Sequence, residues 1–329
     1  MERLINTSNY PLDLDRFGAT SKEVEKFLKK LNLTGVELIQ CGELDEKRLN
    51  GEIIKGVHLR YYPIWLDFYK GNIKELEKQF GTMDTVKQFY GGTIEDIIET
   101  YRNELKLAKS VGAKYVVFHV THVALEHCFT YKFPYSNEEI INASIEFLNE
   151  VLKGFEGDFY LLFENLWWPG LNFLDKKLAE KLLSKVNYSK CGFMLDTAHL
   201  INTNINLNTE EEGIDYVKKK IMELGTLKNH IKGIHLNCSI SGPYVRKKLK
   251  EKITYKNPHS SEEFFENFKL AYDHIFNIDQ HKPFTHTKVS QIVELVSPEF
   301  LVYEFAANTK EILKEYILTQ HKALGISNL

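Results

Sequence analysis

Five short apolar runs in this chain each end on a histidine or a carboxylate, and this recurrence constrains the fold more than any other feature. The residues at these positions are His119, Glu164, Asp196, His235 and Glu304. An apolar run of about five residues bounded by turns is typical of a strand buried in a parallel sheet. A polar side chain at its end is costly to bury unless it is paired or binds a metal. Five such residues predict that the ends of the strands converge on one site.

Strand-like and helix-like segments alternate along the chain. We expect strands at residues 3–8, 34–40, 55–60, 114–120, 158–164, 191–196, 231–236 and 300–305. Helices are expected between most of them, because a Ser or Thr followed three residues later by Glu marks a helix start at Thr20, Ser136, Thr209 and Ser260. This alternation predicts an α/β fold, a (β/α)8 TIM barrel formed by residues 1–329 as one domain. An open doubly wound sheet is the alternative, but no glycine-rich phosphate-binding motif follows an expected strand.

Two connections are too long to be plain barrel loops. Residues 61–92 follow the third expected strand, and residues 237–260 follow the seventh. Connections of this kind lie on the C-terminal face, where TIM barrels hold their active sites. Long loops often act as lids or binding loops, and the many aromatic residues of 61–92 favour a lid over a small ligand.

Charge and cysteine content bear on partners and compartment. The formal net charge is −3, which argues against a nucleic-acid partner without excluding it, since no basic excess is present. No apolar stretch approaches the roughly 20 residues of a membrane span, so no membrane contact is expected. The N-terminus lacks a secretory signal, and the four cysteines (Cys41, Cys128, Cys191 and Cys238) form no CxxC pair. We therefore expect a cytoplasmic protein.

Glu164, Asp196, His235 and Glu304 come from the ends of the last four expected strands. Carboxylate oxygens together with an imidazole nitrogen make a site for a divalent ion such as Mn, Zn, Mg or Co. The alternative is that each is an ordinary polar residue at a strand end. The coincidence of four such residues favours the metal site.

Four further histidines occupy comparable places. His58 and His119 end the third and fourth expected strands, His199 lies three residues after Asp196, and His259 lies in the long loop after the seventh strand. Each could be a further ligand of a metal or of the substrate, but taken singly each is expected to be a satisfied polar residue or one that orients a ligand. The other histidines are expected to be surface or loop residues outside the site. They are His122, His127, His230, His274, His281, His286 and His321.

Four residues are candidates for the substrate pocket. Trp167 and Trp168 closely follow Glu164, and they could stack on a sugar, wall the pocket or pack in the core. Tyr61 begins the first long loop. Arg246 begins a basic run that could meet a phosphate or form a solvated surface.

The chain resembles the xylose isomerase-like TIM-barrel superfamily over roughly residues 34–305. That superfamily includes sugar and sugar-phosphate isomerases and epimerases, inosose dehydratase-type enzymes and the endonuclease IV type of DNA-repair enzyme. The resemblance is carried by six short motifs in order, Gly56-Val-His58, Val117-Phe-His119, Phe163-Glu-Asn165, Leu195-Asp-Thr-Ala-His199, Ile234-His-Leu-Asn237 and Tyr303-Glu-Phe305.

The branches of this superfamily imply different metal centres. The epimerase branch implies one metal on Glu164, Asp196, His235 and Glu304, with Glu164 and Glu304 as the catalytic pair that removes and returns a proton. The endonuclease IV branch implies nine ligands for three zinc ions. Eight of them match His58, His119, Glu164, Asp196, His199, His235, His259 and Glu304. The ninth is an aspartate two residues before the last loop histidine, and Asn257 occupies that position here, which leaves a metal pair bridged by Glu164.

Three hypotheses follow. The first is a metal-dependent sugar or sugar-phosphate isomerase or epimerase with one to three ions per chain. The second is a multi-zinc phosphodiesterase that resembles endonuclease IV and acts on abasic DNA or a smaller phosphoester. The third is a barrel that binds a metabolite without converting it, although binding alone has no need for two opposed glutamates.

Overall fold

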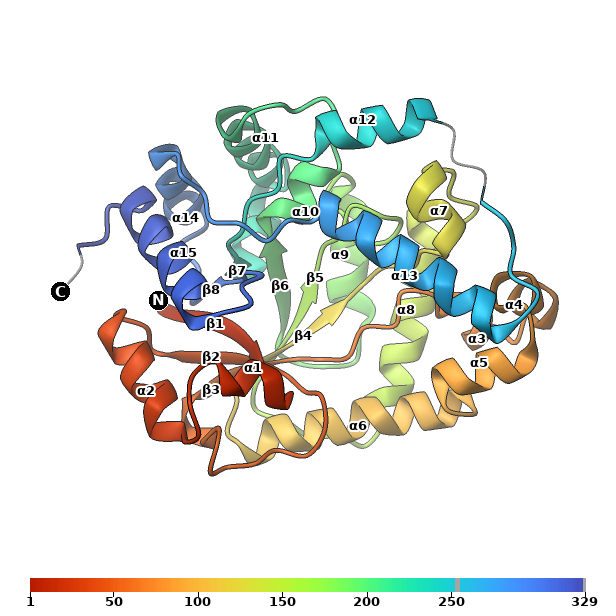
Figure 1. Ribbon diagram of the computed structural model, residues 1–329, viewed down its shortest axis with the longest axis horizontal. Coiled ribbons are helices and arrows are strands. Elements are labelled where there is room, and N and C mark those ends of the chain that lie inside the picture. The colour runs from red at the N-terminus through yellow and green to blue at the C-terminus, as the bar shows by residue number, and fades with distance from the viewer. Residues whose placement is uncertain (252–254, 328–329) are drawn as a thin grey trace.

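The protein is a closed barrel of eight parallel strands surrounded by helices, in a computed structural model that describes residues 1–251 and 255–327 (Figure 1). The strands are β1 (Glu2–Ser8), β2 (Gly35–Ile39), β3 (Ile54–His58), β4 (Tyr115–His119), β5 (Tyr160–Glu164), β6 (Cys191–Asp196), β7 (Ile231–His235) and β8 (Phe300–Tyr303). Each strand pairs with the next, and β8 pairs with β1. The predicted (β/α)8 TIM barrel is confirmed.

Four of the helices begin at the expected start signals. The helices are α1 (Pro11–Asp15), α2 (Ser21–Lys30), α3 (Leu66–Tyr69), α4 (Ile73–Phe80), α5 (Met83–Tyr90), α6 (Ile94–Ser110), α7 (Leu125–Thr130), α8 (Asn137–Val151), α9 (Lys176–Lys185), α10 (Thr197–Asn202), α11 (Glu210–Glu223), α12 (Gly242–Glu251), α13 (Ser261–Ile278), α14 (Ser290–Val296) and α15 (Lys310–Ala323). Thr20, Ser136, Thr209 and Ser260 are the N-caps of α2, α8, α11 and α13. A hydroxyl or carboxylate at these positions satisfies helix N–H groups that have no partner within the helix.

Apolar side chains fill the barrel interior below the site. The inward-facing cluster consists of Leu4, Tyr115, Val117, Leu162, Met194, Phe300 and Val302. Tyr115 crosses the interior beside Gly56, where an added Cβ would lie 2.1 Å from the tyrosine ring. Only glycine leaves this space, and the Tyr115 hydroxyl thereby reaches the Glu37 carboxylate at 2.8 Å.

Both long connections contain helices and lie at the C-terminal end of the barrel. The first, residues 61–92 after β3, carries α3, α4 and α5. The second, residues 237–260 after β7, carries α12 and leads directly into α13. Residues 252–254 of the expected 237–260 connection lie outside the described residues. In Figure 1, α13 runs from beside α10 toward α4 and passes near the ends of β4 and β5. It packs against α4, α5 and α7, so the two insertions are joined above the barrel.

None of the helices in the described ranges is long and apolar enough to cross a lipid bilayer.

Candidate metal centre

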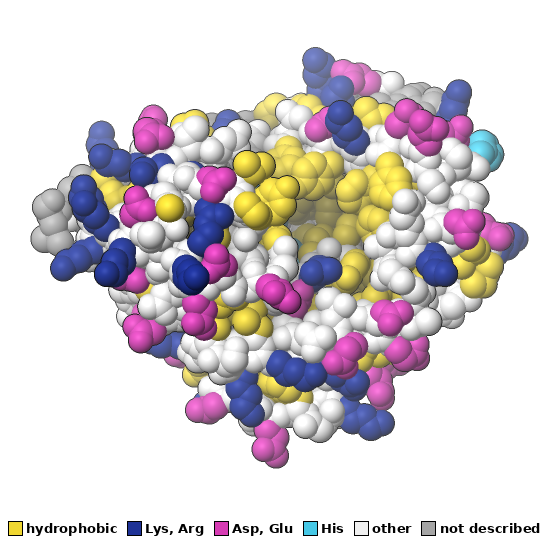
Figure 2. All heavy atoms as spheres, turned by 60° about the horizontal axis from the view of Figure 1, so that its bottom comes forward, with side chains coloured by type: hydrophobic (Ala, Val, Ile, Leu, Met, Phe, Trp, Pro, Cys, Tyr) yellow, Lys and Arg dark blue, Asp and Glu magenta, His cyan; other side chains and the backbone are white. Residues whose placement is uncertain are grey.

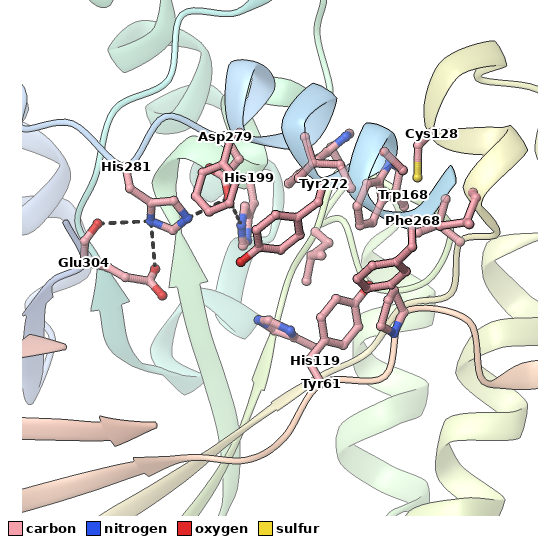
Figure 3. A pocket seen from close by; sticks show the side chains of 18 residues that line it. Tyr61, His119, Cys128, Trp168, His199, Phe268, Tyr272, Asp279, His281 and Glu304 are labelled. Atoms are coloured by element: carbon pink, nitrogen blue, oxygen red, sulfur yellow. Dashed lines mark hydrogen bonds and ion pairs between the residues drawn. The ribbon is translucent and has the colours of Figure 1, made fainter. Parts of the chain in front are cut away.

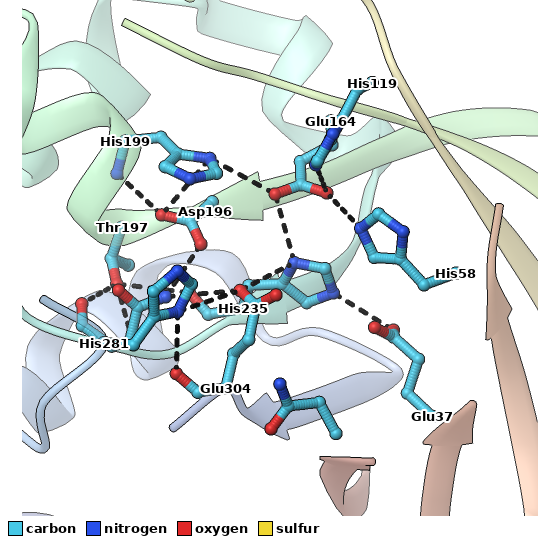
Figure 4. A network of polar contacts seen from close by, with 12 residues as sticks. Glu37, His58, His119, Glu164, Asp196, Thr197, His199, His235, His281 and Glu304 are labelled. Carbon is cyan, nitrogen blue, oxygen red and sulfur yellow. Dashed lines mark hydrogen bonds and ion pairs between the residues drawn. The ribbon is translucent and has the colours of Figure 1, made fainter. Parts of the chain in front are cut away.

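Glu164, at the end of β5, lies at the centre of a cluster of histidines (Figure 4). Its Oε2 is 2.8 Å from His119 Nε2 and 3.1 Å from His58 Nε2. Its Oε1 is 3.2 Å from Nδ1 of both His199 and His235. One fully buried carboxylate therefore presents its two oxygens to four imidazoles from four different elements of the barrel.

Asp196 joins β6 to α10 and turns His199 into the same cluster. Its Oδ1 accepts a hydrogen bond of 2.6 Å from the His199 backbone N–H, which makes Asp196 the N-cap of α10. Its Oδ2 accepts a bond of 2.7 Å from the Asn237 side-chain amide. The His199 Nδ1 lies 3.7 Å from Asp196 Oδ1. The capped turn thus brings an aspartate and the histidine three residues later to one place.

Asp279 and His281 reach the cluster from the segment that follows α13. Asp279 Oδ2 is 2.8 Å from His281 Nε2 and 3.1 Å from His199 Nε2. His281 Nδ1 donates a hydrogen bond of 3.1 Å to the Glu304 backbone carbonyl, since a carbonyl oxygen can only accept. His281 has a φ of 46°, a left-handed conformation that is uncommon outside glycine and often marks a functional site.

The expectation that His281 lies outside the site is therefore wrong. It is a loop residue, but its ring joins the cluster. The spacing of Asp279 and His281, with one residue between them, was the available signal. It carried no strand-end pattern, because a helix rather than a strand precedes it.

His235 ends β7 and is held from below by Glu37 in the middle of β2. His235 Nδ1 lies 3.3 Å from Glu304 Oε2, and its Nε2 lies 3.0 Å from Glu37 Oε2. A carboxylate on the far nitrogen of a metal-binding imidazole usually fixes the orientation of the ring. Sequence reasoning missed Glu37, although a glutamate within the apolar run Val36-Glu-Leu38 was a visible signal.

Five carboxylates of the cluster are buried without a permanent positive charge. They are Glu37, Glu164, Asp196, Asp279 and Glu304. In the ranges that the structure describes, no lysine or arginine forms an ion pair with any of them, and the ion-pair partners recorded for them are histidines.

Burial and the imidazoles act in opposite directions on these carboxylates. Burial raises the pKa of Asp196 to about 8. Burial would also raise the pKa of Glu164, but the neighbouring His119 and His235 outweigh it and hold that pKa well below its ordinary value. In the same way, His235 and His281 lower the pKa of Glu304 against the effect of burial. Buried anions compensated only by imidazoles are the arrangement that a cation would stabilise.

Four groups of side chains could each hold a metal ion, since the ligand atoms of each group lie within 4.8 Å of one another. The groups are Glu164, Asp196, His235 and Glu304; His58, His119 and Glu164; His199, Asp279 and His281; and Glu37, His58 and His235. Two atoms that face the centre, Glu164 Oε1 and His235 Nδ1, are buried and make no hydrogen bond that meets normal geometry. Carboxylate and imidazole donors together suit zinc and similar divalent ions. The residues present therefore fit a metal centre.

Three residues assigned to the site from the sequence lie elsewhere. Asn257 and His259 are exposed, and Asn257 lines a separate cavity beside Glu75 and Lys78. Arg246 lies on α12 and donates hydrogen bonds to the Ile205 carbonyl and the Asn208 side chain, away from the pocket over the cluster. These assignments are corrected, because each residue belongs to the inserted segment and not to a strand end.

Three histidines expected at the surface or in loops are buried inside the protein. The Nδ1 of His122 accepts hydrogen bonds from the backbone N–H groups of Trp65 and Leu66, at the start of α3. His274 on α13 contacts the Tyr244 hydroxyl at 2.9 Å. His321 is also buried, in α15. The expectation was wrong for His274 and His321, which are buried in helices, whereas His122 is a loop residue as expected. A single histidine in a helix carries no sequence signal for burial.

A cavity of about 320 Å³ opens above the cluster. Figure 2 shows it as a hollow edged by hydrophobic side chains, and Figure 3 shows His119, His199, Asp279, His281 and Glu304 on one side of it. Tyr61, Trp167 and Trp168, the other pocket candidates, line this cavity. The centroid of the Trp167 ring lies 5.2 Å from that of the His199 ring and 4.4 Å from that of the Trp168 ring.

Residues 26–290 match the family model described as xylose isomerase-like TIM barrel. Endonuclease IV from Thermus thermophilus superposes with a TM-score of 0.52 at 12% sequence identity, over 99% of this chain and 99% of that chain. The 3-keto-D-glucoside 4-epimerase from E. coli gives a TM-score of 0.48 at 10% identity, over 98% and 99%. The D-allulose 3-epimerase from Methylomonas sp. gives 0.46 at 9%, over 99% and 93%. No curated protein sequence matches significantly. At these identities, the likeness to solved structures shows the fold alone.

Proposed function

The chain belongs to the xylose isomerase-like TIM barrel family, and from this premise we propose that it is an enzyme that hydrolyses phosphoesters with two or three divalent metal ions. The observation that carries the proposal is the position of Asp279 and His281. With His199 they form a group of ligand atoms separate from the quartet that a one-metal epimerase would use.

The full set of ligands supports a centre with several ions. With Asp279 and His281 in place of Asn257 and His259, each of the nine ligand positions that the endonuclease IV resemblance implies has a matching residue. The nine are His58, His119, Glu164, Asp196, His199, His235, Asp279, His281 and Glu304. Five imidazoles favour zinc, while the carboxylates also suit manganese, cobalt or magnesium.

A metal pair would supply an activated water nucleophile and would offset the negative charge on the phosphoryl oxygens. Glu164 would bridge two of the positions, since its two oxygens face different histidines. In hydrolysis the oxygen of water bonds to phosphorus, the ester P–O bond breaks, and the released alkoxide takes up a proton. Glu304 would accept the proton of the attacking water, because it is the carboxylate of the quartet that lines the cavity.

A sugar or sugar-phosphate epimerase is the second candidate. The quartet of Glu164, Asp196, His235 and Glu304 is complete and could hold one ion. In that reaction Glu164 and Glu304 would remove and return the proton on carbon. An epimerase with one metal ion does not need the ligand group of His199, Asp279 and His281, so this group favours hydrolysis over epimerisation.

Metal content and hydrolysis together test the proposal. Protein purified without chelator is analysed for metals and assayed with bis(p-nitrophenyl) phosphate. We expect two or three ions per chain and release of nitrophenol that stops on chelation and returns with zinc or manganese. The variant His259→Ala, in the exposed loop, should behave like the wild type. One ion per chain without nitrophenol release would contradict the proposal and favour the epimerase.

We place this enzyme in the cytoplasm, because its four cysteines are free thiols, as a reducing compartment would keep them.

A further inference from the structure

We infer that the substrate carries a hydrophobic aromatic group beside its phosphoester, and that this group fills the cavity above the metal centre. The inference rests on the proposed phosphoester hydrolysis and narrows its substrate class to small aryl phosphoesters. The ester would lie on the polar side of the cavity, against His119, His199, Asp279, His281 and Glu304.

The walls of the cavity are apolar. They include Val123, Leu125, Leu166, Trp168, Phe268 and Ile275. None of the described residues that line the cavity is a lysine or an arginine. Against these apolar side chains, the hydroxyls of a sugar or the further phosphates of a nucleic-acid strand would lose water without gaining hydrogen-bond partners, which is unfavourable. An aromatic ring has no such hydrogen bonds with water to lose, and it gains free energy when it is buried against the two tryptophan rings.

The size of the cavity and the way it is closed also point to a small molecule. Its volume of about 320 Å³ falls at the lower end of the range for small-molecule sites. Helix α13 forms one wall and packs on the first insertion. Phe264 stacks on Phe80 with ring centroids 4.5 Å apart, and the ring centroids of Phe268 and Phe89 are 5.6 Å apart. This aromatic packing fixes α13 over the mouth, so the site does not continue as an open groove along that side.

Two large side chains at the mouth remain partly in water. Tyr272 and Phe276 line the cavity but are 52% and 46% exposed. Figure 3 shows the hydroxyl end of Tyr272 turned toward the polar side of the cavity. A ligand that covers these side chains removes apolar surface from water, which favours binding. An aryl group seated between the mouth and the tryptophans would cover both side chains, with the Tyr272 hydroxyl facing the ester.

A pair of phosphonates tests the inference by binding alone. Phenylphosphonate and methylphosphonate share a charged head group, so a difference in their affinity reports the cavity wall. We expect metal-loaded protein to bind phenylphosphonate at least roughly tenfold more tightly, as burial of a phenyl ring predicts, when measured by isothermal titration calorimetry. Equal affinities would overturn the inference.

Two variants on α13 test whether the preference for phenylphosphonate arises from the wall of this cavity. Phe276→Ala should reduce the ratio of the two affinities, because it removes part of the wall. Leu270→Ala should keep the ratio, because Leu270 is 61% exposed on the same helix and does not line this cavity. An unchanged ratio in Phe276→Ala, or an equal loss in both variants, would overturn the inference.

The binding test and the hydrolysis test separate the two proposals. A phenyl preference in a protein that does not hydrolyse bis(p-nitrophenyl) phosphate would remove the proposed reaction but support the aromatic cavity. Hydrolysis without a phenyl preference would support the reaction and remove the cavity assignment.

Discussion

Glu304 differs from the other carboxylates of its quartet, because Glu164 and Asp196 are fully buried whereas Glu304 lines the cavity. A proton of the attacking water has a direct route to it. We therefore expect Glu304→Gln to lower kcat by roughly 100-fold or more, the contribution typical of a general base, with little change in circular dichroism. Glu299→Gln is the matched control, since Glu299 lies just before β8 and Glu304 just after it. Near wild-type turnover in Glu304→Gln would remove Glu304 from the proposed role.

Asp279 and Asn257 form a second matched pair, because each precedes a histidine by two positions and only one of them lies in the cluster. We expect Asp279→Asn to lower the number of bound ions by one, since a neutral amide is a weaker ligand than a carboxylate. Asn257→Asp should leave that number unchanged, because Asn257 is exposed in another part of the molecule. Elemental analysis of both variants checks this. A gain of one ion in Asn257→Asp would show that the loop containing His259 takes part in the centre.

Helix α13 is the element that turns an open barrel end into a cavity, and its position depends on one buried phenylalanine. Phe264 is fully buried against Phe80 and Phe89, whereas its neighbour Phe265 is 40% exposed. We expect Phe264→Ala to lower the free energy of unfolding by about 3 to 5 kcal/mol, measured by urea denaturation. Phe265→Ala should lower the free energy of unfolding by less than about 1 kcal/mol, as is usual for exposed sites. Similar losses in both variants would mean that α13 is not held by this packing.

The sequence predicted the strands and the residues at their ends because a buried parallel strand has a strong local signature, and the residue that ends it must face the C-terminal end of the barrel. Glu164 and Asp196 illustrate this, since each is the last residue of its strand. The position of an inserted helix has no such signature. The N-cap at Ser260 identified α13 as a helix but could not place it across the barrel end. For this reason Asn257 and His259 were taken for the ligand pair that Asp279 and His281 form.

Considered as a whole, the barrel encloses a cluster of buried carboxylates and imidazoles that the net charge of the chain does not reveal. The net charge of the chain is only −3, yet five carboxylates lie together at the end of the barrel with histidines as their ion-pair partners. Without a cation, these groups are held ionised or protonated at a cost in folding free energy. The unfolded chain pays no such cost, because each side chain is then in water. Metal binding to the folded barrel should therefore appear as thermal stability.

The expected result is a lower melting temperature after chelation and a recovery when zinc or manganese is added back. An ion present at 100 times its dissociation constant stabilises the folded state by about 2.7 kcal/mol, which for a chain of 329 residues corresponds to a rise of roughly 4 °C. Differential scanning fluorimetry at a series of metal concentrations measures it. Asp279→Asn should show a smaller rise than the wild type, whereas His259→Ala, in the exposed loop, should show the full rise. An equal rise in wild type and Asp279→Asn would place the stabilising ion elsewhere, and no rise in the wild type would mean that the buried carboxylates do not hold a metal.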